Sequence, residues 1–171
     1  MKVFKFGGAS VKDAVGVKNL SSIIHQQHGQ LIVVVSAMGK TTNLLETLCN
    51  AYFHQDPKAT AIMKELKNFH LDIVNTLFPL NAPVYKHLEE LFTNLENILT
   101  SESSLCYDYE YDRIICFGEL ISTTIISDYL KMEGIENQFI DIRKFLKTDQ
   151  NYRNANIDLE LSEQLCKETF D

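Results

Sequence analysis

Apolar residues recur along the chain at two kinds of spacing, which predict short strands and longer helices. Residues 2–6 form a short apolar stretch typical of a strand, and residues 11–28 carry apolar positions on one helical stripe. Gly29 ends that helix, and the unbroken apolar run at 31–38 predicts a strand that is covered on both faces. The order strand, helix, strand predicts a right-handed crossover between parallel strands.

The middle of the chain has helical spacing throughout. Three prolines mark the starts and ends of three expected helices, and a fourth, strongly apolar helix follows. The expected ranges are 41–54, 57–77, 84–100 and 110–133. Residues from about 41 to 133 therefore form a helical excursion from the sheet.

The remaining segment returns to mixed spacing. Residues 137–142 predict a third strand, and a polar loop, a short strand near 155–158 and a helix from 159 follow. The whole pattern predicts an α/β fold, a three-layer sandwich with a mostly parallel sheet. In such folds ligands bind beyond the carboxyl ends of the strands, which brings together the loops at 6–10, at 36–42 and after 141.

Composition narrows the possible functions. The 171 residues suit one domain, and the formal net charge of −7 offers no long-range attraction for nucleic acid or for an anionic membrane. No apolar run reaches the roughly 20 residues of a membrane span. The four cysteines are widely spaced, without a C-x-x-C pair, which argues against both a zinc site and a disulfide framework. We expect a cytoplasmic protein that binds neither nucleic acid nor membrane.

The first loop has the composition of a phosphate site. Lys5 lies within the strand, and Gly7, Gly8, Ala9 and Ser10 lead into a helix. Glycines at such a turn let backbone N–H groups approach an anion, and a lysine supplies a compact cation for a transferring phosphoryl group. Spacing alone leaves open that the glycines make only a tight turn and that the lysine faces solvent.

The second loop, SAMGKTTNLL, looks like the end of a P-loop but is not one. That motif needs a glycine five residues before Gly39, where the sequence has Val34. Ser36, Thr41 and Thr42 still offer neutral hydrogen-bonding groups at a strand end. The alternative is that one of the two threonines caps the following helix.

Glu119 lies in the most apolar helix, within CFGELIST. A carboxylate on such a face is costly to bury without a partner, so it either turns toward water or holds a cationic group such as an amine. The nearby acidic stretch DYEYD, residues 108–112, is better explained as complementing a helix N-terminus than as a metal site.

Together these stretches resemble a known family. KFGGAS at the N-terminus, VVSAMGKTTNLL on the second strand and FGELIST on the later helix are similar to the aspartate kinases of the amino-acid kinase superfamily. IDIRKFLKTDQNYRNANID resembles the family's segment beyond that helix. The resemblance covers essentially the whole chain, in the family's order.

The resemblance implies an enzyme that uses ATP to phosphorylate the side-chain carboxylate of L-aspartate, the entry step to lysine, threonine and methionine biosynthesis. By matching positions, Lys5 would be the catalytic cation that neutralises the ATP phosphates. Gly7, Gly8 and Ser10 would lie beside those phosphates. Catalysis would rest on positioning and electrostatics.

The same resemblance assigns the substrate residues. Ser36 and Thr42 would hold phosphate and aspartate in line, and Glu119 would bind the aspartate amino group. Mg²⁺ would arrive with ATP, without a protein metal site of its own.

The sequence departs from the family in three ways. Ala9 stands where the family usually has threonine, and Arg153 stands where glycine is common. The roles of Arg143 and of the loop after residue 148 stay open. In the family the kinase domain continues further and regulatory ACT domains follow. We therefore expect residues 1–171 to be the N-terminal part of a catalytic domain, lacking the C-terminal nucleotide-binding part and inactive alone.

The expected missing part has a consequence for assembly. A sheet cut midway leaves an edge and an apolar face uncovered, so we expect a homo-oligomer or a weakly stable monomer. Two other functions stay open: a non-catalytic module for small-molecule binding or assembly, and an amino-acid kinase for another substrate such as glutamate.

Overall fold

A parallel pair of strands begins the fold. The computed structural model describes residues 1–170, and side chains through residue 168. Strands β1 (Lys2–Phe6) and β2 (Leu31–Val35) are joined by helix α1 (Ala14–His25) and pair in parallel, with Phe4 opposite Val33. This confirms the predicted order of strand, helix and parallel strand.

Helix α1 and strand β2 are both shorter than the hydrophobic pattern predicted. Helix α1 begins at Ala14 because Asp13 caps it: the Asp13 carboxylate accepts a hydrogen bond from Gly16 N at 2.8 Å. Strand β2 stops at Val35, and Ser36 N donates the last bond of the pair, to Phe6 O at 3.1 Å. The chain then turns away instead of extending through residue 38.

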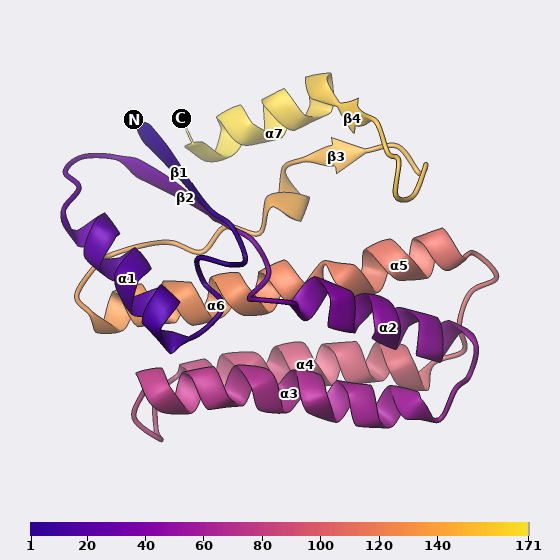
Figure 1. Ribbon diagram of the computed structural model, residues 1–171. Coiled ribbons are helices and arrows are strands. Elements are labelled where there is room, and N and C mark those ends of the chain that lie inside the picture. The colour runs from indigo at the N-terminus through magenta and orange to yellow at the C-terminus, as the bar shows by residue number, and fades with distance from the viewer. Residues whose placement is uncertain (171) are drawn as a thin grey trace.

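The helical excursion forms as predicted, with one difference. Its helices are α2 (Thr41–Phe53), α3 (Lys58–Leu77), α4 (Val84–Thr100), α5 (Tyr107–Ile115) and α6 (Phe117–Met132). The first three match their expected ranges to within one residue. The single helix expected at 110–133 is two helices, α5 and α6, that meet at Cys116. The backbone of Cys116 keeps right-handed helical angles, so the break is local, and α6 continues in nearly the same direction as α5 (Figure 1).

The third strand expected at 137–142 does not form. Asn137 instead bonds back to the end of α6: its amide donates to Ser127 O at 3.1 Å and to Ile135 O at 3.0 Å. At the other end, Asp141 caps a short 3-10 helix, η1 (Ile142–Lys144). Local side-chain bonds thus take the place of a strand ladder.

The tail folds as a small unit of its own. Strand β3 (Lys147–Thr148), which the sequence pattern did not predict, pairs antiparallel with the expected short strand β4 (Ile157–Asp158). Helix α7 (Leu159–Phe170) follows and packs on both strands, as predicted for a helix from residue 159.

The elements stack in layers (Figure 1). Helices α3 and α4 lie side by side at one end of the molecule, α1, α2, α5 and α6 lie between, and the strands lie beyond them. Fully buried side chains from α1, α2, α3 and α6 fill the interior, among them Leu20, Leu45, Leu66 and Ile121. Burying one such side chain contributes about 1.5–3 kcal/mol. The structure is therefore the expected α/β fold, with a small parallel sheet and many helices.

One face of the parallel pair is open. Val3, Ile32 and Val34 are 60%, 45% and 43% exposed, although the opposite face packs against the core through Phe6 and Val33. Within residues 1–170, no helix is both long and apolar enough to cross a membrane.

Candidate functional site

The turn after β1 is tight and directs backbone groups outward. Ser10 N donates to Gly7 O at 2.9 Å, closing a turn in which Gly7, Ala9 and Ser10 are exposed. Gly7 has no heavy atom within 4 Å of where a Cβ would lie. The turn therefore leaves open space beside the carboxyl end of β1.

The loop after β2 packs directly on this turn. A Cβ added to Gly8 would lie 2.6 Å from Ala37 O, closer than side chains approach in proteins, so this position requires glycine. Gly39 N also donates to Gly8 O at 3.1 Å. The two strand-end loops are thus joined backbone to backbone, as the parallel topology predicts.

Helix α6 completes the group. The Glu119 carboxylate accepts a hydrogen bond from Ala37 N at 3.1 Å through Oε1, and the buried Ser122 hydroxyl donates to Ser36 O at 2.8 Å. Gly118 makes the approach possible, because a Cβ there would lie 2.8 Å from the Ala37 Cβ. We call residues 5–10, 36–42 and 118–122 together the strand-end site.

Glu119 fully matches neither of the two arrangements expected from the sequence. It is partly buried and bonded to a backbone amide, not turned freely into water. Only Oε1 is used in that bond, so Oε2 keeps its acceptor capacity for a further donor. The contact with Ala37 could not be predicted from the sequence, because the two residues are 82 positions apart.

Lys5 lies on the open face of the sheet, opposite Val34. Its side chain is exposed and, among the residues that the structure describes, forms no ion pair or side-chain hydrogen bond. The cation is therefore on the exposed face of β1 next to the Gly7–Ser10 turn, with its charge uncompensated.

The hydroxyl groups of the second loop differ from one another. Ser36 and Thr42 are partly buried, whereas Thr41 is only 2% exposed. Neither threonine caps α2, whose N-cap is Lys40 without a side-chain cap bond. The Thr41 hydroxyl instead donates to Met38 O at 2.6 Å and lies 3.3 Å from His70 Nε2. The capping interpretation is therefore wrong.

The acidic stretch 108–112 opens α5, as predicted. Asp108 and Glu110 lie in the first turn, and Glu110 is fully buried, accepting a bond from Ser104 N at 2.7 Å. Asp112 accepts a bond from Arg153 N at 2.9 Å. No group of three acidic, histidine or cysteine side chains in the described part of the chain could hold a metal ion.

Arg153 shows why glycine suits its position. Its φ of +60° lies in the left-handed region, which costs energy for any residue with a Cβ. Its side chain compensates through a 3.1 Å ion pair with Asp108 and by stacking 4.3 Å from the Tyr111 ring.

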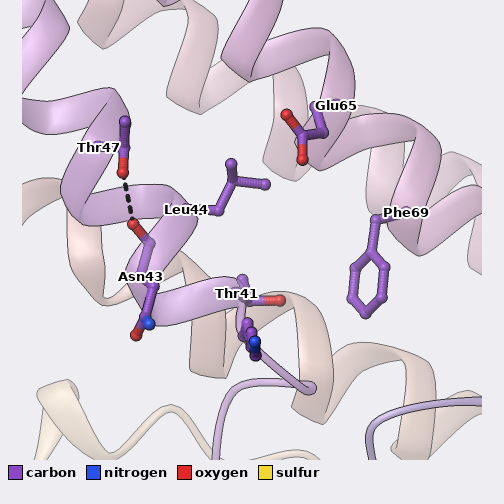
Figure 2. Close-up of a pocket in the computed structure, with 7 residues that line it drawn as sticks. Thr41, Asn43, Leu44, Thr47, Glu65 and Phe69 are labelled. Carbon is purple, nitrogen blue, oxygen red and sulfur yellow. Dashed lines mark hydrogen bonds between the residues drawn. The ribbon is translucent and has the colours of Figure 1, made fainter.

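Two surface hollows lie along helix α2. One, of about 300 Å³, lies between α2 and α3 (Figure 2) and is lined by Lys40, Thr41, Asn43, Leu44, Thr47, Glu65 and Phe69. The other, of about 440 Å³, is lined by Glu46, Thr47, Asn50, Tyr107, Tyr111 and Arg153. None of the seven residues predicted to bind phosphate or substrate lines either hollow.

The sequence assigned no role to two groups beside the strand-end site. Arg143 donates to both carboxylate oxygens of Asp141, which lowers the pKa of that carboxyl, and its Nη1 lies 3.4 Å from Cys116 Sγ. This ties η1 to the start of α6. The second group is His70, which lies on the buried stripe of α3 with Leu66 and Ile73. Its helical spacing from Leu66 and Ile73 was a signal in the sequence that His70 is buried.

The comparison with known families decides the assignment. A model described as the amino acid kinase family matches residues 1–170. The chain belongs to the amino acid kinase family. Two curated members are an aspartokinase of Chlamydia pneumoniae, 28% identical over 93% of this chain and 34% of the relative, and the chloroplastic aspartokinase 2 of Arabidopsis thaliana, 31% identical over 91% and 29%. This amino acid kinase chain thus spans about a third of the length of the relatives that it matches.

A solved member of the amino acid kinase family confirms the fold. The crystal structure of Escherichia coli aspartokinase III in complex with aspartate and ADP superposes with a TM-score of 0.87. The match covers 99% of this chain and 37% of that one, at 24% identity. At this identity the likeness establishes the architecture alone.

Proposed function

We propose that residues 1–171 are the N-terminal part of an aspartate kinase catalytic domain, with residues from about 41 to 133 as its helical excursion. The observation that carries this proposal is the bond from Ala37 N to Glu119 Oε1, which, with the bond from Gly39 N to Gly8 O, brings the three predicted motifs into one site. Aspartokinase relatives, and a similar structure that binds aspartate and ADP, support the substrates.

The proposed reaction is phosphoryl transfer. A carboxylate oxygen of the L-aspartate side chain attacks the γ-phosphorus of ATP, the bond to the β,γ-bridging oxygen breaks, and ADP leaves. Neither a nucleophilic side chain nor a proton transfer is needed. The protein's task is to position two anions in line and to stabilise the charge that shifts between them.

Lys5, Gly7, Gly8 and Ser10 form the phosphate side of this proposal. The Lys5 ammonium, which has no partner among the described side chains, lies beside an exposed turn, which suits a cation that must follow charge on a transferring group. The open space at Gly7 suits close approach of a phosphate oxygen. The described carboxylates do not cluster as magnesium ligands, so Mg²⁺ would be held chiefly by the nucleotide.

Ser36, Thr42 and Glu119 form the substrate side. Because Ala37 N holds Oε1 of Glu119, the carboxylate has a fixed orientation, and Oε2 is left to accept a bond from the aspartate ammonium. The same proposal includes a nucleotide-binding part and ACT domains beyond this chain. It also includes low activity of residues 1–171 alone. A cytoplasmic location would fit the need for ATP.

Turnover of the full-length gene product tests the proposal. We expect ADP release that depends on L-aspartate, and not on L-glutamate, in a coupled assay. Lys5→Ala should lower kcat on the order of a hundredfold, because it removes a cation aimed at transition-state charge.

Lys2→Ala is the matched control, since Lys2 lies on the same strand but bonds to Gln27 at the far end. Full turnover of the Lys5 variant would instead favour a non-catalytic binding role for this segment of the enzyme. The absence of aspartate-dependent ADP release from the wild type would end the kinase proposal.

A further inference from the structure

The hollow between α2 and α3 has no part in the proposed reaction. Its volume of about 300 Å³ lies at the lower end of the roughly 300–1,000 Å³ over which proteins bind small molecules. Lys40 and Thr41 in its lining also belong to the strand-end site, but none of the residues assigned to phosphate or aspartate lines it. The hollow is therefore a second cavity, which shares part of its lining with the strand-end site.

Apolar side chains from both helices line this hollow. Leu44 on α2 and Phe69 on α3 are partly buried. In Figure 2 the Leu44 side chain points from α2 toward Glu65 on α3, and the Phe69 ring lies one turn further along α3. Leu44 and Phe69 thus offer an apolar surface on which a small hydrophobic group would lose contact with water.

Two opposite charges line the same hollow. Lys40 and Glu65 are exposed, and neither side chain forms an ion pair or a hydrogen bond with another residue that the structure describes. A simple anion would be attracted by Lys40 and repelled by Glu65, and a simple amine would meet the reverse. A ligand that carries both charges is attracted by both residues. An α-amino acid carries them on one carbon, which leaves its side chain free for the apolar surface.

We propose that the hollow between α2 and α3 binds a free α-amino acid with an apolar side chain. The ligand carboxylate pairs with Lys40 and the ligand ammonium with Glu65. The ligand side chain packs on Leu44 and Phe69. Because exposed ion pairs contribute little, the affinity is on the order of millimolar. L-Aspartate suits the hollow poorly, because its second carboxylate would lie on the apolar surface.

The hollow also contacts the turn that joins the two strand-end loops. The Phe69 ring lies 3.5 Å from the position that a Cβ on Gly39 would take, and Gly39 N donates to Gly8 O. Lys40 and Thr41 continue the same turn. A ligand that packs on Phe69 and pairs with Lys40 restricts the motion of both residues. We therefore expect the bound ligand to protect the Gly39 N–H from hydrogen exchange.

An NMR titration of this chain with L-leucine, L-methionine and L-phenylalanine tests the site. We expect at least one of them to shift the amide signals of residues 43–47 and 65–69, with saturation in the millimolar range. Its analogues that lack the ammonium or the carboxylate should bind several-fold more weakly, as should L-aspartate; for L-leucine the analogues are 4-methylpentanoate and 3-methylbutylamine. The proposal is overturned if none of the three amino acids gives a saturating shift up to about 20 mM. Equal binding of an amino acid and either of its analogues, or of L-aspartate, would overturn it too.

Substitution of the two charged residues locates the site. Lys40→Gln and Glu65→Gln should each weaken binding several-fold, and both positions are exposed, so the fold is kept. The matched controls are Lys64→Gln and Glu89→Gln, which remove the same charges from exposed positions outside the hollow and should leave binding unchanged. Exchanging the charges, Lys40→Glu with Glu65→Lys, should recover part of the binding that either reversal alone removes, because a zwitterion can enter in the opposite orientation. Equal weakening by the controls would contradict the assigned contacts.

Amide hydrogen exchange provides the second readout. Saturating ligand should slow exchange at Gly39 several-fold in the wild type, and the same ligand concentration should have less effect in Glu65→Gln. Unchanged exchange at Gly39 with the ligand bound would contradict the contact between the hollow and the turn. Neither readout uses turnover, so failure of the proposed kinase activity and failure of this site are distinguishable.

Discussion

The burial of His70 makes the stability of the fold depend on pH. Its pKa is about 4 in the folded chain, against 6.5 for an unperturbed histidine, because burial disfavours the charged ring. Between these two values the unfolded state binds a proton that the folded state does not. The free energy of unfolding therefore carries no penalty from His70 above pH 6.5, and it falls because of this residue as the pH drops toward 4.

We expect the free energy of unfolding of the wild type, relative to His70→Gln, to fall by about 3 kcal/mol between pH 7 and pH 4. Urea unfolding of both proteins across this range measures it. The variant removes the titrating ring and keeps all the carboxylates, so acid effects from groups such as Asp141 cancel in the difference. A difference that does not change with pH would show that the ring is hydrated.

The two glycines after β1 have different tasks. Gly8 is required by packing, since its Cβ would meet Ala37 O at 2.6 Å, whereas nothing lies within 4 Å of a Cβ at Gly7. Gly8→Ala must therefore push the two strand-end loops apart, at a cost of about 1–3 kcal/mol. Gly7→Ala should change stability by less than about 0.5 kcal/mol. Thermal or urea unfolding of the pair measures the difference, and equal losses would refute the assigned contact.

The geometry of the strand-end site explains which parts of it could be predicted from the sequence. Parallel strands end at one edge, so the meeting of the Gly7–Ser10 turn with the loop after Val35 was predictable from the order of elements. The bond between Ala37 and Glu119 was not, because hydrophobic spacing carries no information about which helix crosses which loop. The predicted ranges of helices α2 to α4 were accurate because prolines and periodic apolar residues mark these helices locally.

The errors in the elements have local causes as well. The break at Cys116 has no proline to mark it, and the nearby Gly118 lies inside α6. The strand expected at 137–142 was lost to side-chain bonds of Asn137 that a hydrophobic pattern cannot show. His70 looked like an ordinary core position, since burial alone does not reveal its contact with Thr41.

The open face of the parallel pair matters for the molecule as a whole. Val3, Ile32 and Val34 are exposed on this face, with Lys5 opposite Val34, and in the described chain β1 and β2 pair only with each other. Such a face with open strand edges favours association. We therefore expect residues 1–171 to form homo-oligomers at high concentration.

Sedimentation velocity tests this expectation. Ile32→Lys should shift the distribution toward monomer, because it removes an apolar side chain from this face and adds a second charge to that of Lys5. Val15→Lys is the control: Val15 is 74% exposed but lies on α1, away from that face. A wild-type chain that stays strictly monomeric at high concentration would contradict the prediction, as would equal effects of the two lysines.

The bond between Ala37 and Glu119 also sets the order in which the site can arise during synthesis. It joins segments 82 residues apart, and Ser36 and Ser122 are 86 residues apart. The chain between them folds into helices with mostly local contacts, which form quickly, whereas closing so long a loop is slow. On the ribosome the strands and the first helices are available early, but the site can close only after α6 has emerged. Until then the nascent chain exposes both strand-end loops without the carboxylate that joins them.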